Sequence, residues 1–229
     1  MFAELSVDGA LLSILQIIVI DILLGGDNAV VIALACRKLP PALRNQGIAW
    51  GVFGAVVLRV LLVFFALQLL AMPFLKIIGA LLLLWIGIKL LRPAEADEDH
   101  EVTQSATLFG AVRTIIVADA VMSVDNVIAV AGAAKGHIGL VAFGIAISVP
   151  IIVWGSRLVL WLMDRFPIVV VLGGAMLGWI AGEMLVTDVF LKPYTEDWPH
   201  WTKYVAAAAG ALFVFVTGRM VWRLTAVRP

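Results

Sequence analysis

Long apolar runs separated by short polar turns dominate the hydropathy pattern of this 229-residue chain. A helix needs about 20 apolar residues to cross a hydrocarbon core of about 30 Å. Seven runs reach that length, and they are residues 9–35, 47–70, 72–91, 105–134, 138–163, 167–190 and 202–223. The runs are continuous rather than alternating, and in lipid each backbone amide must find its partner within its own segment. The pattern therefore predicts an all-α membrane protein with seven transmembrane helices.

Composition agrees with a single transmembrane domain over 1–229. Hydrophobic residues make up 63% of the chain and charged residues 14%, whereas soluble domains contain about a quarter charged residues. The first residues lack Lys and Arg, so we expect no cleaved signal peptide. Cys36 is the one cysteine and cannot form an internal disulfide. With 16 basic and 16 acidic residues, nothing indicates nucleic-acid binding. We expect no enzymatic activity and no resident cofactor.

The distribution of Lys and Arg predicts the orientation. Ten of these residues fall on the side that holds the C-terminus and four on the other, when Arg59 and Arg157 are left out as intramembrane. The positive-inside rule then places the N-terminus outside and the C-terminus in the cytoplasm. The polar acidic linker 92–104 is cytoplasmic in this arrangement.

The two halves of the chain match each other. The segment "DILLGGDNAVVIA" at 21–33 aligns with "DAVMSVDNVIAVA" at 119–131 at an offset of 98, which also carries Arg59 onto Arg157. At an offset of 94, Pro73, Gly79, Trp85 and Ile86 fall on Pro167, Gly173, Trp179 and Ile180. Each half, 9–91 and 105–190, contains three spans, so the second half enters the membrane from the opposite side. We expect two inverted three-helix repeats plus a seventh helix at 202–223, an architecture typical of secondary transporters.

Four carboxylates and two amides interrupt the first and fourth spans. They are Asp21, Asp27, Asn28, Asp119, Asp125 and Asn126. An ionised Asp at the centre of a transmembrane helix costs about 2.5 to 3.5 kcal/mol on insertion scales. A bound cation, a shared proton or a buried Arg compensates for such a cost. Asp and Asn oxygens form a hard ligand set that suits Mg²⁺, Mn²⁺ or Ca²⁺ better than Cu(I) or Zn²⁺.

Helix geometry constrains how these residues meet. Positions 21 and 27 are about 240° apart around an ideal helix and do not share a face. Gly25-Gly26 lies between them and lowers the cost of unwinding. Ser123-Val124 stands at the equivalent place in the second repeat, so we expect a sharper break in the first span than in the fourth.

These motifs also carry a resemblance. "GGDNAVVIALACRKLP", "ADAVMSVDNVIAVAGAAKGH" and "GWIAGEMLVTD" resemble the TerC family of integral membrane proteins, and most its short YjbE-type members. The resemblance spans nearly the whole chain. It implies a seven-helix fold of the LysE transporter superfamily and export of a metal, most often manganese, across the bacterial cytoplasmic membrane. The acidic motif positions carried over from the family are Asp21, Asp27, Asn28, Asp119, Asp125 and Asn126.

The mechanism we expect is alternating access around a midplane cation site. Asp27 and Asn28 with Asp125 and Asn126 coordinate a divalent ion, with Mn²⁺ the expected one, and Asp21 and Asp119 complete the shell or exchange protons. Proton antiport is a hypothesis for the coupling.

Other readings stay open for several residues. The Asp–Asn pairs also suit caps of broken helices or hydrogen bonds between the repeats. Arg59 and Arg157 are either counter-charges for the acidic site or structural residues that reach backbone carbonyls. Glu183 is a proton carrier, an extra ligand or an interfacial residue.

Two other classes of function also remain. An exporter of amino acids or similar solutes would use Arg59 or Arg157 to bind a carboxylate. An intramembrane aspartyl protease would need two facing aspartates. The lipid bilayer and a divalent ion are the partners expected from the main reading.

Overall fold

The computed structural model describes residues 7–65, 69, 72–91, 107–133, 138–195 and 198–226, and the regular structure in these residues is helical. The helices are α1 (Val7–Arg37), α2 (Pro41–Phe64), α4 (Leu75–Leu91), α5 (Leu108–Ala133), α6 (Ile138–Arg165), α7 (Pro167–Val186), α8 (Lys192–Thr195) and α9 (Thr202–Ala226). Each of the seven predicted spans overlaps one long helix. The predicted linker 92–104 lies outside the described residues.

Four segments of the described chain are long and apolar enough to cross a membrane, and they are Pro41–Phe64, Val141–Arg165, Pro167–Val186 and Thr202–Met220. They belong to α2, α6, α7 and α9. By length alone, α1 with 31 residues and α5 with 26 residues also suffice, whereas α4 has 17. The chain is therefore a multi-pass membrane protein, and the crossing number of seven remains a prediction.

Several helix boundaries differ from those predicted from hydropathy, including the end of α2 at Phe64 rather than at 70 and the beginning of α4 at Leu75 rather than at 72. The second helix begins at Pro41 rather than at 47, because proline suits the first position of a helix and lacks the amide that would have no partner there. Its first turns hold Arg44, Asn45 and Gln46, which lowered the hydropathy of that stretch. The sixth helix ends at Val186 rather than at 190.

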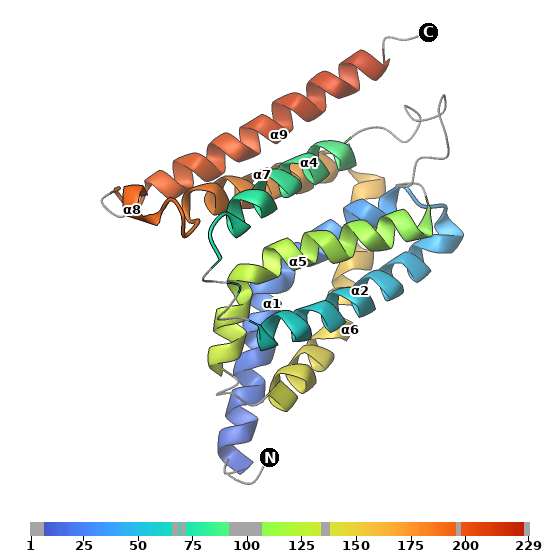
Figure 1. The fold of residues 1–229 in the computed structure, drawn as a ribbon. Coiled ribbons are helices and arrows are strands. Elements are labelled where there is room, and N and C mark those ends of the chain that lie inside the picture. The colour runs from blue at the N-terminus through green and yellow to red at the C-terminus, as the bar shows by residue number, and fades with distance from the viewer. Residues whose placement is uncertain are drawn as a thin grey trace.

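The predicted break in the first span is wrong. α1 is one continuous helix and passes through Gly25 and Gly26. Glycine inside a helix costs about 1 kcal/mol relative to alanine, whereas a backbone group without a partner in lipid costs several kcal/mol. The helical hydrogen bonds are therefore kept. α5 is also helical throughout its length, although its ribbon bends toward its C-terminal end (Figure 1).

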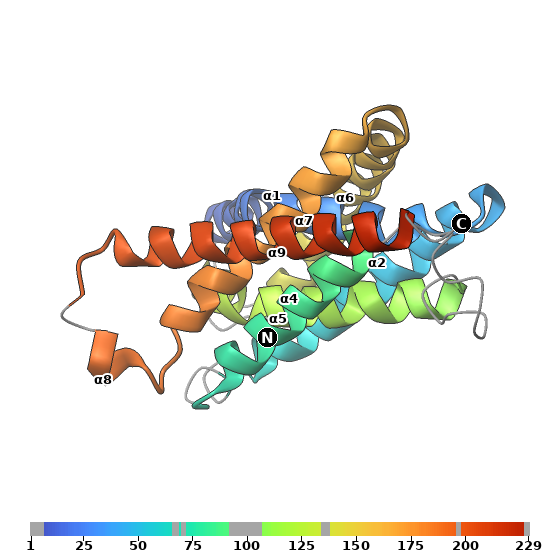
Figure 2. The same ribbon diagram turned by 90° about the horizontal axis from the view of Figure 1, so that it is seen from above.

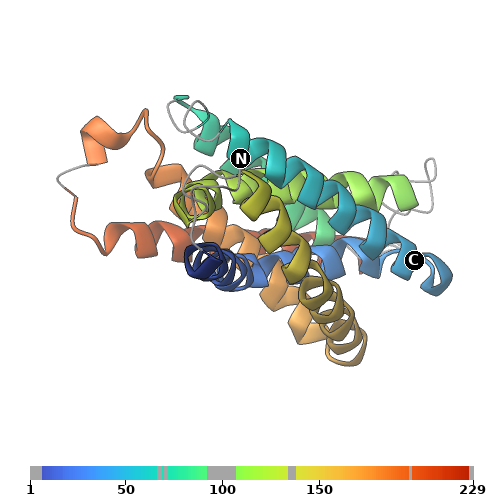
Figure 3. The ribbon, with the colours of Figure 1, turned by 90° about the horizontal axis from the view of Figure 1, so that it is seen from below.

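The helices form three layers. α9 lies over α4 and α7, which in turn lie over α1, α2, α5 and α6 (Figure 1, Figure 2). In the lowest layer the halves of the chain are packed crosswise, because α1 packs mainly against α6 and α2 mainly against α5. Figure 3 shows this layer from below. Small residues allow the close approach, since Gly51 of α2 faces Ile115 of α5 and Gly144 of α6 faces Ile17 of α1.

The outer surface of the bundle is apolar. On α2, Trp50, Phe53, Val57 and Leu61 are between 46% and 61% exposed, and their spacing of three to four residues puts them on one face. Such a stripe is costly in water and suits lipid. The exposed large apolar residues therefore identify the faces that contact the bilayer.

Asp188 joins the end of α7 to the beginning of α4. Its side chain is fully buried and accepts four backbone hydrogen bonds. The amides of Phe74 and Phe190 donate to Oδ1 at 3.0 and 2.7 Å, and those of Lys76 and Ile77 donate to Oδ2 at 3.0 and 3.2 Å. Burial alone raises the pKa of Asp188, but the four donors outweigh it and hold the pKa below its usual value. Asp188 thus supplies the first turn of α4 with the cap that its own sequence lacks.

We expect Asp188→Ala to lower the free energy of unfolding by about 2 to 3 kcal/mol, because buried amides lose a charged acceptor. The pKa is lower in the folded state than the value of about 3.9 in the unfolded state, so the stabilisation is complete above the unfolded pKa. It is lost as the pH falls through the folded pKa. Thermal unfolding in detergent at pH 7 and at a series of acidic values measures both effects. Equal melting temperatures for the wild type and Asp188→Ala at pH 7 would contradict this role.

Candidate functional site

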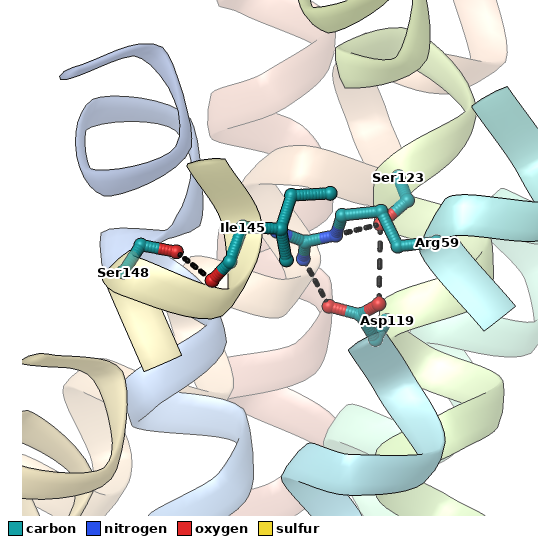
Figure 4. Close-up of polar contacts among 5 residues, drawn as sticks. All are labelled: Arg59, Asp119, Ser123, Ile145 and Ser148. Carbon is teal, nitrogen blue, oxygen red and sulfur yellow. Dashed lines mark hydrogen bonds and ion pairs between the residues drawn. The ribbon is translucent and has the colours of Figure 1, made fainter. Parts of the chain in front are cut away.

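A buried ion pair joins α2 to α5 in the interior of the lowest layer. The Nη2 of Arg59 donates to Oδ1 of Asp119, and the side chains of both residues are 6% exposed. The Nε of Arg59 donates to Oγ of Ser123 at 3.1 Å, and that hydroxyl donates to Oδ2 of Asp119 at 3.2 Å. Figure 4 shows this triangle, with Arg59 reaching from α2 to the two residues of α5. Each carboxylate oxygen of Asp119 therefore accepts at least one hydrogen bond.

Ser123 is the residue that the sequence analysis missed. It is fully buried and stands one helical turn after Asp119, so that its hydroxyl reaches both members of the ion pair. At the offset of 98, its counterpart in the first repeat is Gly25, which has no side chain. The two motifs otherwise match, so the serine in place of a glycine was the signal in the sequence that could have identified Ser123.

Asp27 and Asn28 of α1 hold polar atoms without partners. Asn28 is 4% exposed and Asp27 is half-buried. Among the buried side-chain atoms of the described residues, Oδ1 of Asp27 and both Oδ1 and Nδ2 of Asn28 form no hydrogen bond. Asp27 is close enough to Arg59 and Asp119 to be attracted by the first and repelled by the second. Asp27 therefore lies within electrostatic range of the Arg59–Asp119 ion pair.

Unpartnered polar atoms of this kind need an explanation. Burying an amide or carboxylate without a hydrogen bond costs about 1 to 3 kcal/mol or more, and buried polar atoms in proteins nearly always have partners. A carboxylate oxygen beside an amide oxygen is a ligand pair that hard divalent cations prefer. A bound ion or water molecule would supply the missing interactions of these two adjacent residues on α1.

The structure does not gather all the predicted site residues. Asn126 is half-buried on α5. The side chains of Asp21 and Asp125 lie outside the described ones. Arg157 is exposed on α6 and forms no ion pair with a described side chain. Among the described residues, no group of three His, Cys, Asp or Glu side chains is placed to hold a metal. Asp27 and Asn28 are thus adjacent on α1, and metal binding by these residues and by the second-repeat residues stays a prediction.

Glu183 lies apart from the Arg59–Asp119 pair. Its carboxylate on α7 faces Nζ of Lys203 on α9 at 3.9 Å, and both side chains are 41% exposed. An exposed pair of this kind contributes at most about 1 kcal/mol. The interfacial reading of Glu183 agrees with this position.

Comparisons with known proteins agree with this picture of a membrane protein. Residues 7–226 match the model of the integral membrane protein TerC family. An uncharacterized membrane protein, YjbE of Bacillus subtilis, is 46% identical over 178 residues, which cover 78% of this chain and 81% of the relative. The inner membrane protein YgdQ of Escherichia coli K12 is 25% identical over 228 residues, which cover 93% and 95%. No solved structure matches the chain. Since the family model covers nearly every described residue, this chain belongs to the TerC family of integral membrane proteins.

Proposed function

We propose that this chain is a secondary transporter that exports a divalent cation, with Mn²⁺ as the expected cargo. The observation that carries the proposal is the pair of unpartnered, buried oxygens on Asp27 and Asn28, inside an apolar bundle and within electrostatic range of the Arg59–Asp119 pair. Intramembrane ionisable residues are rare and mark ion or proton pathways. A divalent ion with oxygen ligands would satisfy both side chains at once.

The proposed ligand set takes residues from both halves of the chain. Asp27 and Asn28 come from the first half, and Asp125 and Asn126 hold the equivalent places in the second. Contact between α1 and α5 supports this pairing, because these helices carry the two motifs. Asp21 and Asp119 complete the shell or exchange protons in this proposal.

The architecture supports a transporter of the inverted-repeat type. In the alignment of the two halves, α1 corresponds to α5 and α2 corresponds to α6. The crosswise packing of α1 on α6 and of α2 on α5 is unchanged by that exchange. We also propose seven crossings, from the seven apolar runs, a cytoplasmic C-terminus, from the distribution of Lys and Arg, and membership of the LysE superfamily, from the resemblance of the motifs. Rocking of the halves around a midplane site is the movement that this class uses.

Arg59 has a definite role in the proposal. Its guanidinium neutralises Asp119 in the structure as described, so Asp119 does not serve as a ligand in this conformation. A cation arriving near Asp27 is repelled by Arg59 and attracted by Asp119. We propose that metal binding or protonation shifts the Arg59–Asp119 pair and that this shift is linked to the change between inward and outward access.

The Arg59 geometry also bears on the other two functions. A solute carboxylate at Arg59 would compete with Asp119, because the guanidinium already donates to Asp119 and Ser123. A protease dyad would need two carboxylates that share a proton, whereas Asp119 is paired with an arginine. Both arrangements favour the cation transporter.

The test is transport by the purified protein in liposomes. Vesicles loaded with a divalent-sensitive dye are exposed to Mn²⁺, Mg²⁺ or Ca²⁺ under an imposed pH gradient, with empty vesicles as the control. We expect protein-dependent uptake of Mn²⁺ that rises with the opposing proton gradient. Uptake of radiolabelled lysine without uptake of any of the three ions would overturn the proposal in favour of a solute exporter.

A further inference from the structure

A cavity of about 460 Å³ opens where α1 and α4 end and α7 begins, beside Phe215–Arg219 of α9. Leu91, Ile168, Val171 and Phe215 are among its apolar lining residues, and Arg37 and Arg219 are its charged ones. It is separate from the Arg59 neighbourhood, with which it shares no lining residue. The C-terminal ends of α4 and α9 lie on the same side of the molecule (Figure 1, Figure 2).

The position of the cavity corresponds to the headgroup level of a bilayer. Arg37 is the last residue of α1, Leu91 the last of α4, and Pro167 the first of α7. These ends mark where apolar helix gives way to polar connection, which is the depth at which lipid headgroups lie. Ile168 is 60% exposed and Arg219 is also exposed, so the cavity is open to its surroundings.

The two arginines are available to an external anion. Among the described residues, neither Arg37 nor Arg219 forms a side-chain ion pair. Asp164 attracts Arg37, but its carboxylate Oδ2 is bound to Nη1 of Arg44 at 2.5 Å. The Nη2 of Arg44 in turn donates to the backbone carbonyl of Arg37 at 3.1 Å, which holds the end of α1 in place.

We propose that this cavity binds an anionic phospholipid, with one acyl chain against the apolar wall and the phosphate between Arg37 and Arg219. A small hydrated anion gains nothing from apolar walls, and an uncharged acyl chain gains nothing from two guanidiniums. Phosphatidylglycerol matches both features, since arginine binds phosphate with paired charge-assisted hydrogen bonds. Basic pockets between transmembrane helices bind lipid headgroups by this combination of charge and apolar contact.

The test counts lipids bound to the full-length protein in detergent by native mass spectrometry. We expect retention of one phosphatidylglycerol per chain and at least tenfold weaker retention of phosphatidylethanolamine. The double variant Arg37→Gln/Arg219→Gln should lose at least tenfold in retention of phosphatidylglycerol. The matched control is Arg165→Gln, which removes an exposed arginine from the end of α6 without touching the cavity. Equal retention by the wild type and the double variant would overturn the proposal.

Two further variants separate the cavity from general surface charge. Val171→Trp fills the cavity and keeps both arginines, and we expect it to lose the lipid as the double variant does. Unchanged retention by Val171→Trp would mean attraction to the surface alone and would overturn the proposal.

The acidic linker that follows Leu91 is the competing occupant, and it is tested by neutralising Glu95, Asp97, Glu98, Asp99 and Glu101 together. Unchanged lipid retention supports the lipid. If the wild type retains little lipid and the neutralised variant retains severalfold more, the linker fills the cavity and the proposal is overturned.

Discussion

Replacing Asp27 by asparagine is expected to reduce Mn²⁺ transport by about 100-fold or more while the protein still inserts and folds. The substitution keeps the volume of the side chain and removes its charge. Even residues that only support a metal ligand contribute about 10- to 100-fold to affinity, so a charged ligand contributes more. Initial rates in proteoliposomes, corrected for the amount of inserted protein, measure the effect.

The control for this variant is Asp164→Asn, which removes an exposed carboxylate at the end of α6. We expect that control to transport at nearly the wild-type rate, since an exposed ion pair contributes at most about 1 kcal/mol to stability. If Asp27→Asn transports as fast as Asp164→Asn, Asp27 is not a ligand.

The second large effect concerns stability. Arg59→Met is expected to lower the free energy of unfolding by about 3 to 5 kcal/mol, because it leaves Asp119 buried beside Ser123 without its positive partner. Asp119→Leu should cost a similar amount, since it isolates the guanidinium. Thermal unfolding in detergent, followed by circular dichroism, gives the melting temperatures.

The double variant Arg59→Met/Asp119→Leu distinguishes an ion pair from two independent residues. Replacing both charges by apolar side chains of similar size is often nearly neutral for stability. We therefore expect the double variant to regain most of the stability lost by either single variant. It should not transport, because the proposed change of access needs the Arg59–Asp119 pair. If the double variant loses as much free energy of unfolding as the two single variants together, Arg59 and Asp119 act independently.

Hydropathy predicted the helices well because a bilayer requires every backbone amide and carbonyl to form a hydrogen bond within the protein. Each of the seven apolar runs became one helix, since no other structure satisfies the backbone of an isolated segment in a bilayer. The residues at which the helices begin and end were less predictable. Pro41 starts α2 ahead of the apolar run, and α7 stops where Asp188 turns back to α4.

Residues of the site were predicted to different degrees. The duplicated motif identified Asp27, Asn28 and Asp119 because a carboxylate or amide in an apolar run stands out. Ser123 in the site and Asp188 outside it did not stand out, because their roles depend on partners 64 and 114 positions away in the sequence. The expected break at Gly25–Gly26 failed because the energetic preference of two glycines is smaller than the need for backbone hydrogen bonds in lipid.

Binding of Mn²⁺ to the purified protein tests the central claim most directly. Free aqueous Mn²⁺ gives a sharp electron paramagnetic resonance signal that is lost on binding, so titration gives stoichiometry and affinity together. We predict one site per chain in the wild type, an affinity at least tenfold lower in Asn28→Ala, and loss of the site in Asp27→Asn. Equal binding by the wild type and Asp27→Asn would contradict the assignment of the cation site to α1.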